Sequence, residues 1–152
     1  MAQQPIVLIT FSCQSGDTEK LALGAAVGAV QARALIRLRR LPDSDTAQAS
    51  DTLIRMRKEY VVPAEKDILG ADALIFASSS DVTASAEPWQ SFLDLLWKLH
   101  GEGKLNGKVG AGIGGVFPIV AQLGFVTIAE TPADPIALGR RVADKARSLK
   151  ST

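Results

Sequence analysis

The sequence predicts an α/β protein built on a parallel sheet with helices on both faces. Short apolar runs alternate along the chain with stretches whose apolar residues recur every three or four positions. The runs lack the polar alternation of a strand that faces water, so we expect strands buried on both faces. Because crossovers between parallel strands are right-handed, this alternation indicates a doubly wound sheet in a single domain, residues 1–152.

The first half of the chain supplies three of the expected strands and two helical segments. A helix expected at Thr18–Val30 has a stripe of mostly alanine side chains that suits close packing on a sheet. A long polar crossover follows the second strand, and we expect part of it, around Thr52–Lys58, to be helical. The five expected strands are Ile6–Thr10, Ala34–Leu38, Ala73–Ala77, Val109–Ile113 and Phe125–Ala129.

Two further helices are indicated by their terminal residues. Pro88 suits a first helical turn, and Gly101 suits a helix end, so the third crossover is expected to be helical. Near the C-terminus, Asp134 and Pro135 supply a cap and a first turn for a helix over Ile136–Leu149. Its inward side chains are expected to be Val142, Ala143, Ala146 and Leu149.

Composition excludes several classes of function. Seventeen basic and sixteen acidic residues give a net charge of +1, which argues against nucleic acid as a main partner. One cysteine and one histidine argue against an internal disulfide and a structural metal site. No apolar stretch approaches the roughly 20 residues needed to cross a bilayer, and no basic region precedes the first apolar run. We therefore expect a cytoplasmic protein with no membrane partner.

Small polar residues gather between the first strand and the first helix, in FSCQSGDTEKLA. Backbone N–H groups of a glycine-containing loop before a helix form a concave anion site, to which serine and threonine hydroxyls add donors. The same residues also suit a simple helix cap, and spacing alone leaves both explanations open. The loops after Thr10, Ala77 and Ile113 would meet at the carboxyl ends of the strands, where ligands bind in such folds.

Three stretches resemble a known family. FSCQSGDTEKLA resembles the phosphate loop of flavodoxins, with Gly16, Thr18 and Glu19 in the matching positions. DILGADALIFASSSDVTASAEPWQSFLDLL and GKLNGKVGAGIGG resemble NAD(P)H:quinone oxidoreductases of the tryptophan-repressor-binding-protein (WrbA) type. The resemblance runs from Ile6 to about Gly115 and again over the last helix. It implies a flavodoxin-like fold with five parallel strands in the order 2-1-3-4-5.

The resemblance also implies a cofactor, FMN, and a reaction in which electrons pass from NAD(P)H to a quinone or a similar small-molecule acceptor. It implies a homo-oligomer as well. No protein nucleophile is required, and no catalytic residue is assigned. The residues it implies at the phosphate are Ser12, Gln14, Ser15, Gly16, Asp17 and Thr18; at the flavin ring Ser78, Ser79, Ser80, Asp81, Val82 and Thr83; and at a third wall Gly112, Gly114 and Gly115.

The chain departs from this family at the ring loop, where Asp81 and Val82 replace an Arg-Phe pair and Ser79 replaces a proline. A ring contact and a positive charge are thereby lost. Two hypotheses follow: an FMN-dependent oxidoreductase, or a flavodoxin-like domain that has lost its cofactor and serves as an interaction or scaffold protein. Trp97 and His100 lie near the position of a family aromatic that can face a neighbouring subunit's flavin; more often, such residues pack in the core or at the surface.

The last crossover is short. Nine residues, Val116–Gly124, separate Gly115 from Phe125, whereas parallel crossovers normally need about a dozen or more. We predict either a compact crossover of about two helical turns beside an open flavin crevice, or a longer native chain with additional loop residues at Gly115–Val116 and Ala129–Glu130.

Overall fold

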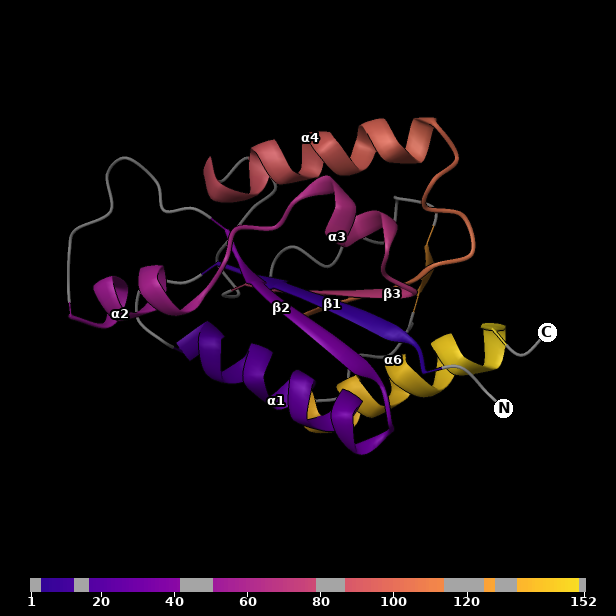
Figure 1. The fold of residues 1–152 in the computed structure, drawn as a ribbon, viewed down its shortest axis with the longest axis horizontal. Helices are drawn as coiled ribbons and strands as arrows, with labels where there is room; N and C mark the ends of the chain where they lie inside the picture. The colour runs from indigo at the N-terminus through magenta and orange to yellow at the C-terminus, as the bar shows by residue number, and fades with distance from the viewer. Residues whose placement is uncertain are drawn as a thin grey trace.

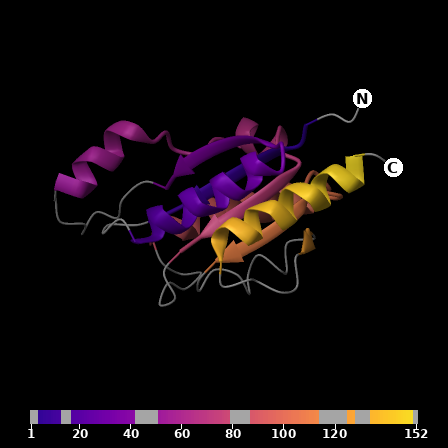
Figure 2. The ribbon, with the colours of Figure 1, turned by 90° about the horizontal axis from the view of Figure 1, so that it is seen from below.

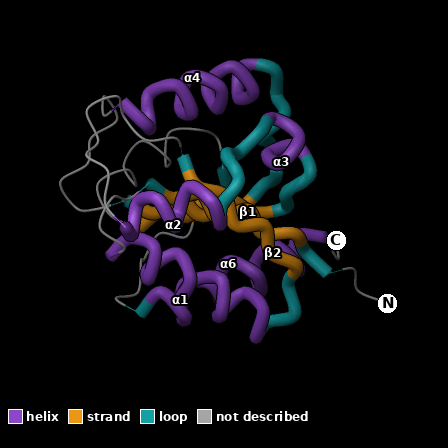
Figure 3. Tube along the Cα trace, turned by 60° about the vertical axis from the view of Figure 1, so that its left-hand side comes forward, coloured by secondary structure: helices purple, strands orange, loops and turns teal. Residues whose placement is uncertain are grey.

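The computed structural model describes residues 4–12, 17–41, 51–78, 87–113, 125–127 and 134–150. Helices cover both faces of a central sheet (Figures 1 and 3). The predicted α/β architecture with a parallel sheet is therefore confirmed. The last crossover, 114–124, lies outside the described residues, so our two explanations of its short length stay predictions.

The sheet is entirely parallel and has the strand order β2-β1-β3-β4-β5. Four strands of five or six residues form its body, and β5 adds two residues beside β4. We expected the fifth strand to span residues 125–129; positions 128 and 129 lie outside the described part. The strands are β1 (Ile6–Phe11), β2 (Leu35–Arg40), β3 (Ala73–Ala77), β4 (Val109–Ile113) and β5 (Val126–Thr127).

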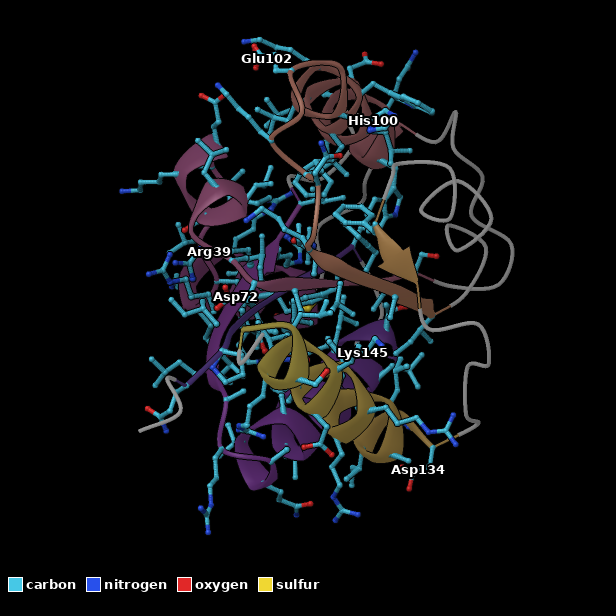
Figure 4. All side chains as sticks on the ribbon, turned by 90° about the vertical axis from the view of Figure 1, so that its right-hand side faces the viewer. Arg39, Asp72, His100, Glu102, Asp134 and Lys145 are labelled. Atoms are coloured by element: carbon cyan, nitrogen blue, oxygen red, sulfur yellow. The ribbon has the colours of Figure 1, made fainter. Side chains whose placement is uncertain are left out.

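The helices at the expected positions are present, together with one that the sequence analysis missed, α3. The cap of the last helix is as predicted, because the carboxylate of Asp134, which Figure 4 labels at the start of that helix, accepts a hydrogen bond from the N–H of Ile136 at 2.9 Å. The helices are α1 (Asp17–Gln31), α2 (Asp51–Glu59), α3 (Glu65–Leu69), α4 (Glu87–Gly101) and α6 (Pro135–Lys150).

Helices α1 and α6 lie side by side on one face of the sheet (Figure 2). Alanines of α1 and small or branched residues of α6 are buried there against β1, β3 and β4. The two backbones approach closely where both helices have glycine. A Cβ added at Gly28 would lie 1.9 Å from the carbonyl oxygen of Ile136, and one added at Gly139 would lie 2.0 Å from that of Ala25. Only glycine therefore fits either position without a shift of backbone.

Helices α3 and α4 cover the opposite face with large side chains (Figure 1). Phe76 of β3 lies at the centre of an aromatic group, with ring centroids 5.9 to 6.3 Å from those of its three neighbours. A Cβ on Gly110 would come within 2.6 Å of the Phe125 ring, so that glycine leaves the space which the ring fills. The three neighbours of Phe76 are Trp89, Phe92 and Phe125.

Strand β2 differs from our expectation of a strand buried on both faces. It is an edge strand, and Leu35 at its start is about half exposed. Toward its carboxyl end, the outer edge pairs with a residue after α2: the N–H of Arg40 donates to the carbonyl oxygen of Val61 at 3.0 Å. Charged residues suit such an edge because they disfavour pairing with another strand. Within the described part of the chain, no helix is long and apolar enough to span a membrane.

Candidate functional site

The carboxyl ends of four neighbouring strands lie in one row. In the register of the sheet, Phe11 of β1 is opposite Arg40 of β2 and Ala77 of β3, and Ala77 is opposite Ile113 of β4. The chain reverses its direction of winding between β1 and β3, since β2 lies on one side of β1 and all later strands lie on the other. In doubly wound sheets, this point at the carboxyl edge is where ligands bind.

Backbone hydrogen bonds continue one residue beyond the strands. The N–H of Ser12 donates to the carbonyl oxygen of Ala77 at 3.4 Å, and the N–H of Ser78 donates to that of Ile113 at 2.9 Å. Ser12 thus bonds to the last residue of β3, and Ser78 directly follows that residue, so these two predicted site residues leave the sheet at adjacent strands. The chain segments that follow both serines start from one fixed edge.

The Ser78 side chain is only 1% exposed, and its hydroxyl donates to the carbonyl oxygen of Ile113 at 3.4 Å. This hydroxyl holds β3 against β4. Gly112 is likewise a buried residue within β4, opposite Phe76. Ser78 and Gly112, which we predict at the flavin ring and at the third wall, therefore lie at the carboxyl ends of β3 and β4.

The first turn of α1 follows β1 closely. Asp17 is the first residue of this helix of 15 residues, and Thr18 beside it is 4% exposed. The amide N–H groups of a first turn have no partner within their own helix, which makes the turn suitable for an anion. The remaining predicted site residues lie outside the described part of the chain: Gln14, Ser15, Gly16, Ser79, Ser80, Asp81, Val82, Thr83, Gly114 and Gly115.

The same turn holds a buried acid that we did not predict as a site residue. Glu19 is 6% exposed, and its carboxylate oxygens accept hydrogen bonds from the Arg55 guanidinium at 2.7 and 3.1 Å. The Tyr60 hydroxyl donates to the same carboxylate at 2.5 Å. Arg55 also contacts Glu59 at 2.6 Å. Arg55 lies on α2 and Tyr60 directly after it, so this cluster attaches the second crossover to the start of α1.

Burial, hydrogen bonds and nearby charges together set the ionisation of this cluster. The hydrogen bonds from Arg55 hold the pKa of Glu19 below its usual value, and Tyr60 and the charge of Arg40 act in the same direction against the effect of burial. Burial, together with the Glu19 carboxylate, raises the pKa of Tyr60 well above its usual value. At neutral pH the cluster therefore contains an ionised glutamate and a protonated tyrosine.

The sequence indicated only one member of this cluster, Glu19. Glu19 is in the motif that resembles a flavodoxin phosphate loop, but Arg55 and Tyr60 are 36 and 41 residues away along the chain. No local spacing relates residues so far apart. The ring of Tyr60 also packs against Phe11, with centroids 5.0 Å apart and ring planes at 88°. It therefore joins the acid cluster to the end of β1.

Trp97 and His100 lie away from this edge. Trp97 is 43% exposed and packs against the His100 ring, with centroids 5.7 Å apart. Both are toward the C-terminal end of α4, beside the turn that enters β4 at its amino end (Figures 1 and 4). The fold thus separates them from the carboxyl-end residues of their own chain. Among the described residues, no group of three or more His, Cys, Asp or Glu side chains could hold a metal ion.

Solved structures define the fold class. A flavodoxin, WrbA-like protein from Agrobacterium tumefaciens superimposes with a TM-score of 0.64 at 17% identity, over 95% of this chain and 99% of that one. A flavodoxin from the domain Archaea gives a TM-score of 0.59 at 17% identity, again over 95% and 99% of the two chains. The chain has a flavodoxin-like fold.

Curated relatives resemble the chain in sequence. An NAD(P)H dehydrogenase (quinone) from Archaeoglobus fulgidus is 29% identical over 111 residues, which are 69% of this chain and 58% of that protein. A protein of the same name from Brucella anthropi is 32% identical over 108 residues, 69% of this chain and 53% of that protein. The resemblance to quinone oxidoreductases is confirmed, although the chain spans about half the length of the curated relatives it matches. No family model matches the sequence.

Proposed function

We propose that this protein binds FMN at the carboxyl edge of its sheet and transfers electrons from NAD(P)H to a quinone or a similar acceptor. The observation that supports it best is the single row of strand ends with the N-terminus of α1 beside it. The relatives named NAD(P)H dehydrogenase (quinone) support the reaction. The choice between NADH and NADPH and the identity of the acceptor remain for experiment.

The donors at this edge fit a phosphate. The first turn of α1 presents backbone amides, Ser12 and Thr18 offer hydroxyl groups, and the acid in that turn, Glu19, is held by a cation. Neutral donors of this kind bind a phosphate without a lysine. In this proposal the residues that hold the phosphate are Ser12, Gln14, Ser15, Gly16, Asp17 and Thr18.

FMN, when bound, would supply the hydride and electron chemistry, which protein side chains cannot perform. The chain's part would be to orient the ring, exclude water and supply hydrogen bonds. Residues that follow β3 and β4 would do this, because both strands end at the same edge as β1. They are Ser78, Ser79, Ser80, Asp81, Val82 and Thr83 after β3, and Gly112, Gly114 and Gly115 at the end of β4. A homo-oligomer and a cytoplasmic location stay predictions.

Flavin binding is the direct test. We expect the purified protein, saturated with FMN and then desalted, to keep flavin absorbance, and we expect bound FMN to lose fluorescence. Protein that retains no flavin and quenches no fluorescence would exclude the oxidoreductase and leave the scaffold hypothesis, which the changed ring loop at Asp81 and Val82 favours. Loss of flavin absorbance on anaerobic addition of NADH or NADPH, and its return on addition of a quinone, would then test the reaction.

Gly16→Val tests the position of the phosphate. A valine side chain would obstruct the approach of a phosphate to the loop backbone, and it would be strained wherever the backbone is left-handed. We expect FMN affinity to fall at least about tenfold while the far-ultraviolet circular dichroism stays unchanged. Unchanged affinity in a folded Gly16→Val protein would place the phosphate elsewhere.

A further inference from the structure

A buried carboxylate in the first turn of α1 presents an electrostatic problem for the proposed phosphate site. Glu19 is the third residue of α1, so it belongs to the turn whose amides would face the phosphate. The carboxylate is ionised at neutral pH, because its pKa lies below the usual value. An ionised carboxylate repels a phosphate, and the repulsion is strong where burial reduces screening by water. Without compensation, Glu19 would weaken the site.

The compensation comes from a different part of the chain. Arg55 contacts both carboxylate oxygens of Glu19, at 2.7 and 3.1 Å, in the paired geometry that arginine forms with carboxylates. Its own side chain is partly exposed, whereas that of Glu19 is almost fully buried. The buried acid therefore depends on a cation that reaches it from α2.

Contacts of Arg55 and of its neighbours on α2 hold the guanidinium in position. It contacts Glu59, which lies four residues later on α2, at 2.6 Å, and Met56 beside it is fully buried in the core that α1 and α6 share. Tyr60, at the end of α2, packs on Phe11 and donates to Glu19. These contacts set the guanidinium in one place next to the start of α1. The compensating charge is therefore in place before a ligand binds.

We propose that Arg55 is a positioning residue for the phosphate of FMN, acting through Glu19. It neutralises this carboxylate, so that a doubly charged phosphate can bind at the first turn of α1. The inference rests on the proposed function. It goes beyond it by assigning to the second crossover a role in the choice between phosphorylated and unphosphorylated flavin.

The test compares FMN with riboflavin, which has the same ring system and no phosphate. Fluorescence quenching gives a dissociation constant for each, and their ratio isolates the contribution of the phosphate. The variants are Arg55→Met, Glu19→Gln, the double variant and Arg55→Lys. Lys58→Met is the matched control, because it removes one positive charge from an exposed position on the same helix.

We expect Arg55→Met to lower the preference for FMN over riboflavin about tenfold, since it removes the cation that is hydrogen-bonded to Glu19 and leaves only the charge of Arg40 to act on this carboxylate. The double variant should return to within about threefold of the wild-type preference, because glutamine has no charge to repel phosphate. Glu19→Gln alone should preserve or increase the preference. Arg55→Lys should keep most of it, and Lys58→Met should leave it unchanged.

A purely structural role for the pair predicts a different pattern. Glu19→Gln would then lower the preference as Arg55→Met does, and the double variant would not recover; either result would overturn the inference. The Glu19→Gln arm decides the question even if Arg55→Met does not fold. If the wild-type protein binds riboflavin and FMN equally, Arg55 has no phosphate to position and the inference is wrong, while flavin binding stands. If the wild type binds neither, the proposed function fails and this inference fails with it.

Discussion

The two faces of the sheet are packed in opposite ways. Helices α1 and α6 meet one face through alanines and touch each other at Gly28 and Gly139, with backbone against backbone. Helix α4 covers the other face with aromatic rings around Phe76. In β4, the absence of a side chain at Gly110 leaves space for one of these rings, that of Phe125. On one face, two helices pack closely against each other and against the sheet. On the other face, large side chains fill the space between the helix and the sheet.

This difference indicates how each face should respond to mutation. Where helices are close, any added atom meets backbone, which cannot rotate away. Where rings fill the space, the loss of atoms leaves a cavity, and a swap between side chains of similar size is tolerated. Enlarging substitutions should therefore be most harmful at α1 and α6, and truncating ones at α4.

Trp89→Ala should have the largest effect. Trp89 is fully buried and packs against Phe76 and Phe92. We expect the free energy of unfolding to fall by about 4 kcal/mol. Trp89→Phe should cost less than about 1.5 kcal/mol, because the ring is kept and an indole N–H without a hydrogen-bond partner among the described residues is removed. Urea unfolding measures both, and equal costs would contradict the packing of this face by rings.

Gly28→Ala is the corresponding test of the other face. One methyl group would be placed within 1.9 Å of the Ile136 carbonyl oxygen, so α1 and α6 must separate. We expect a loss of about 3 kcal/mol in the free energy of unfolding, despite the higher helix propensity of alanine. Gly101→Ala is the control, since no atom lies within 4 Å of a Cβ there. A neutral Gly28→Ala would show that the helices are not in contact.

Asp67→Asn tests a buried charge on α3, which covers the same face of the sheet as α4. Burial alone would raise the pKa of Asp67, but the Ala64 N–H, at 2.9 Å, and Arg39, at 3.2 Å, hold it below its usual value. A lowered pKa stabilises the fold above the unfolded-state pKa of about 4, and this stability is lost as the pH falls through the folded-state pKa. We expect Asp67→Asn to cost about 1–2 kcal/mol at pH 7 and less at pH 3. Denaturant unfolding at both pH values checks this, and an equal cost at both would contradict it.

Val27→Thr should have the smallest effect. Val27 lies on α1 but points away from the sheet, with 46% of its surface exposed. We expect a change of less than about 0.5 kcal/mol in the free energy of unfolding. Ala25→Val, on the buried side of the same helix, should cost several times more, because Ala25 is fully buried at the contact with Gly139. Similar thermal midpoints for the two variants would contradict the assignment of faces.

The buried strands were predictable from sequence because their signal is local. The bounds of Ala73–Ala77 and Val109–Ile113 were predicted to the residue, and Ile6–Phe11 to within one residue. Central parallel strands are apolar on both faces, so their limits coincide with those of the apolar runs. Strand β2 was misjudged in its burial because its place at the edge depends on strand order, which no run of residues reveals.

Other parts depended on contacts between distant residues. Helix α3 has five residues, too few for a helical period, and its buried residues are Asp67 and Ile68. Its position depends on the bond from Arg39, which lies 28 residues earlier. At the candidate site, the approach of Ser12 to Ser78 follows from the parallel arrangement of strands that the sequence predicted. The Arg55 and Glu19 pair does not, because it joins two helices whose relative position is fixed only by packing.

The central place of β1 has a consequence for biosynthesis. This strand is made before the other strands of the sheet, but its partner β3 begins only at Ala73, and the N–H of Ile6 donates to the Asp72 carboxylate at 2.8 Å. A nascent chain that stops short of Ala73 therefore leaves one edge of IVLITF unpaired. That segment is apolar, rich in β-branched residues and uncharged, which is the composition that favours strand-to-strand aggregation. While the second crossover is translated, this edge is therefore open to pairing with a strand of another chain.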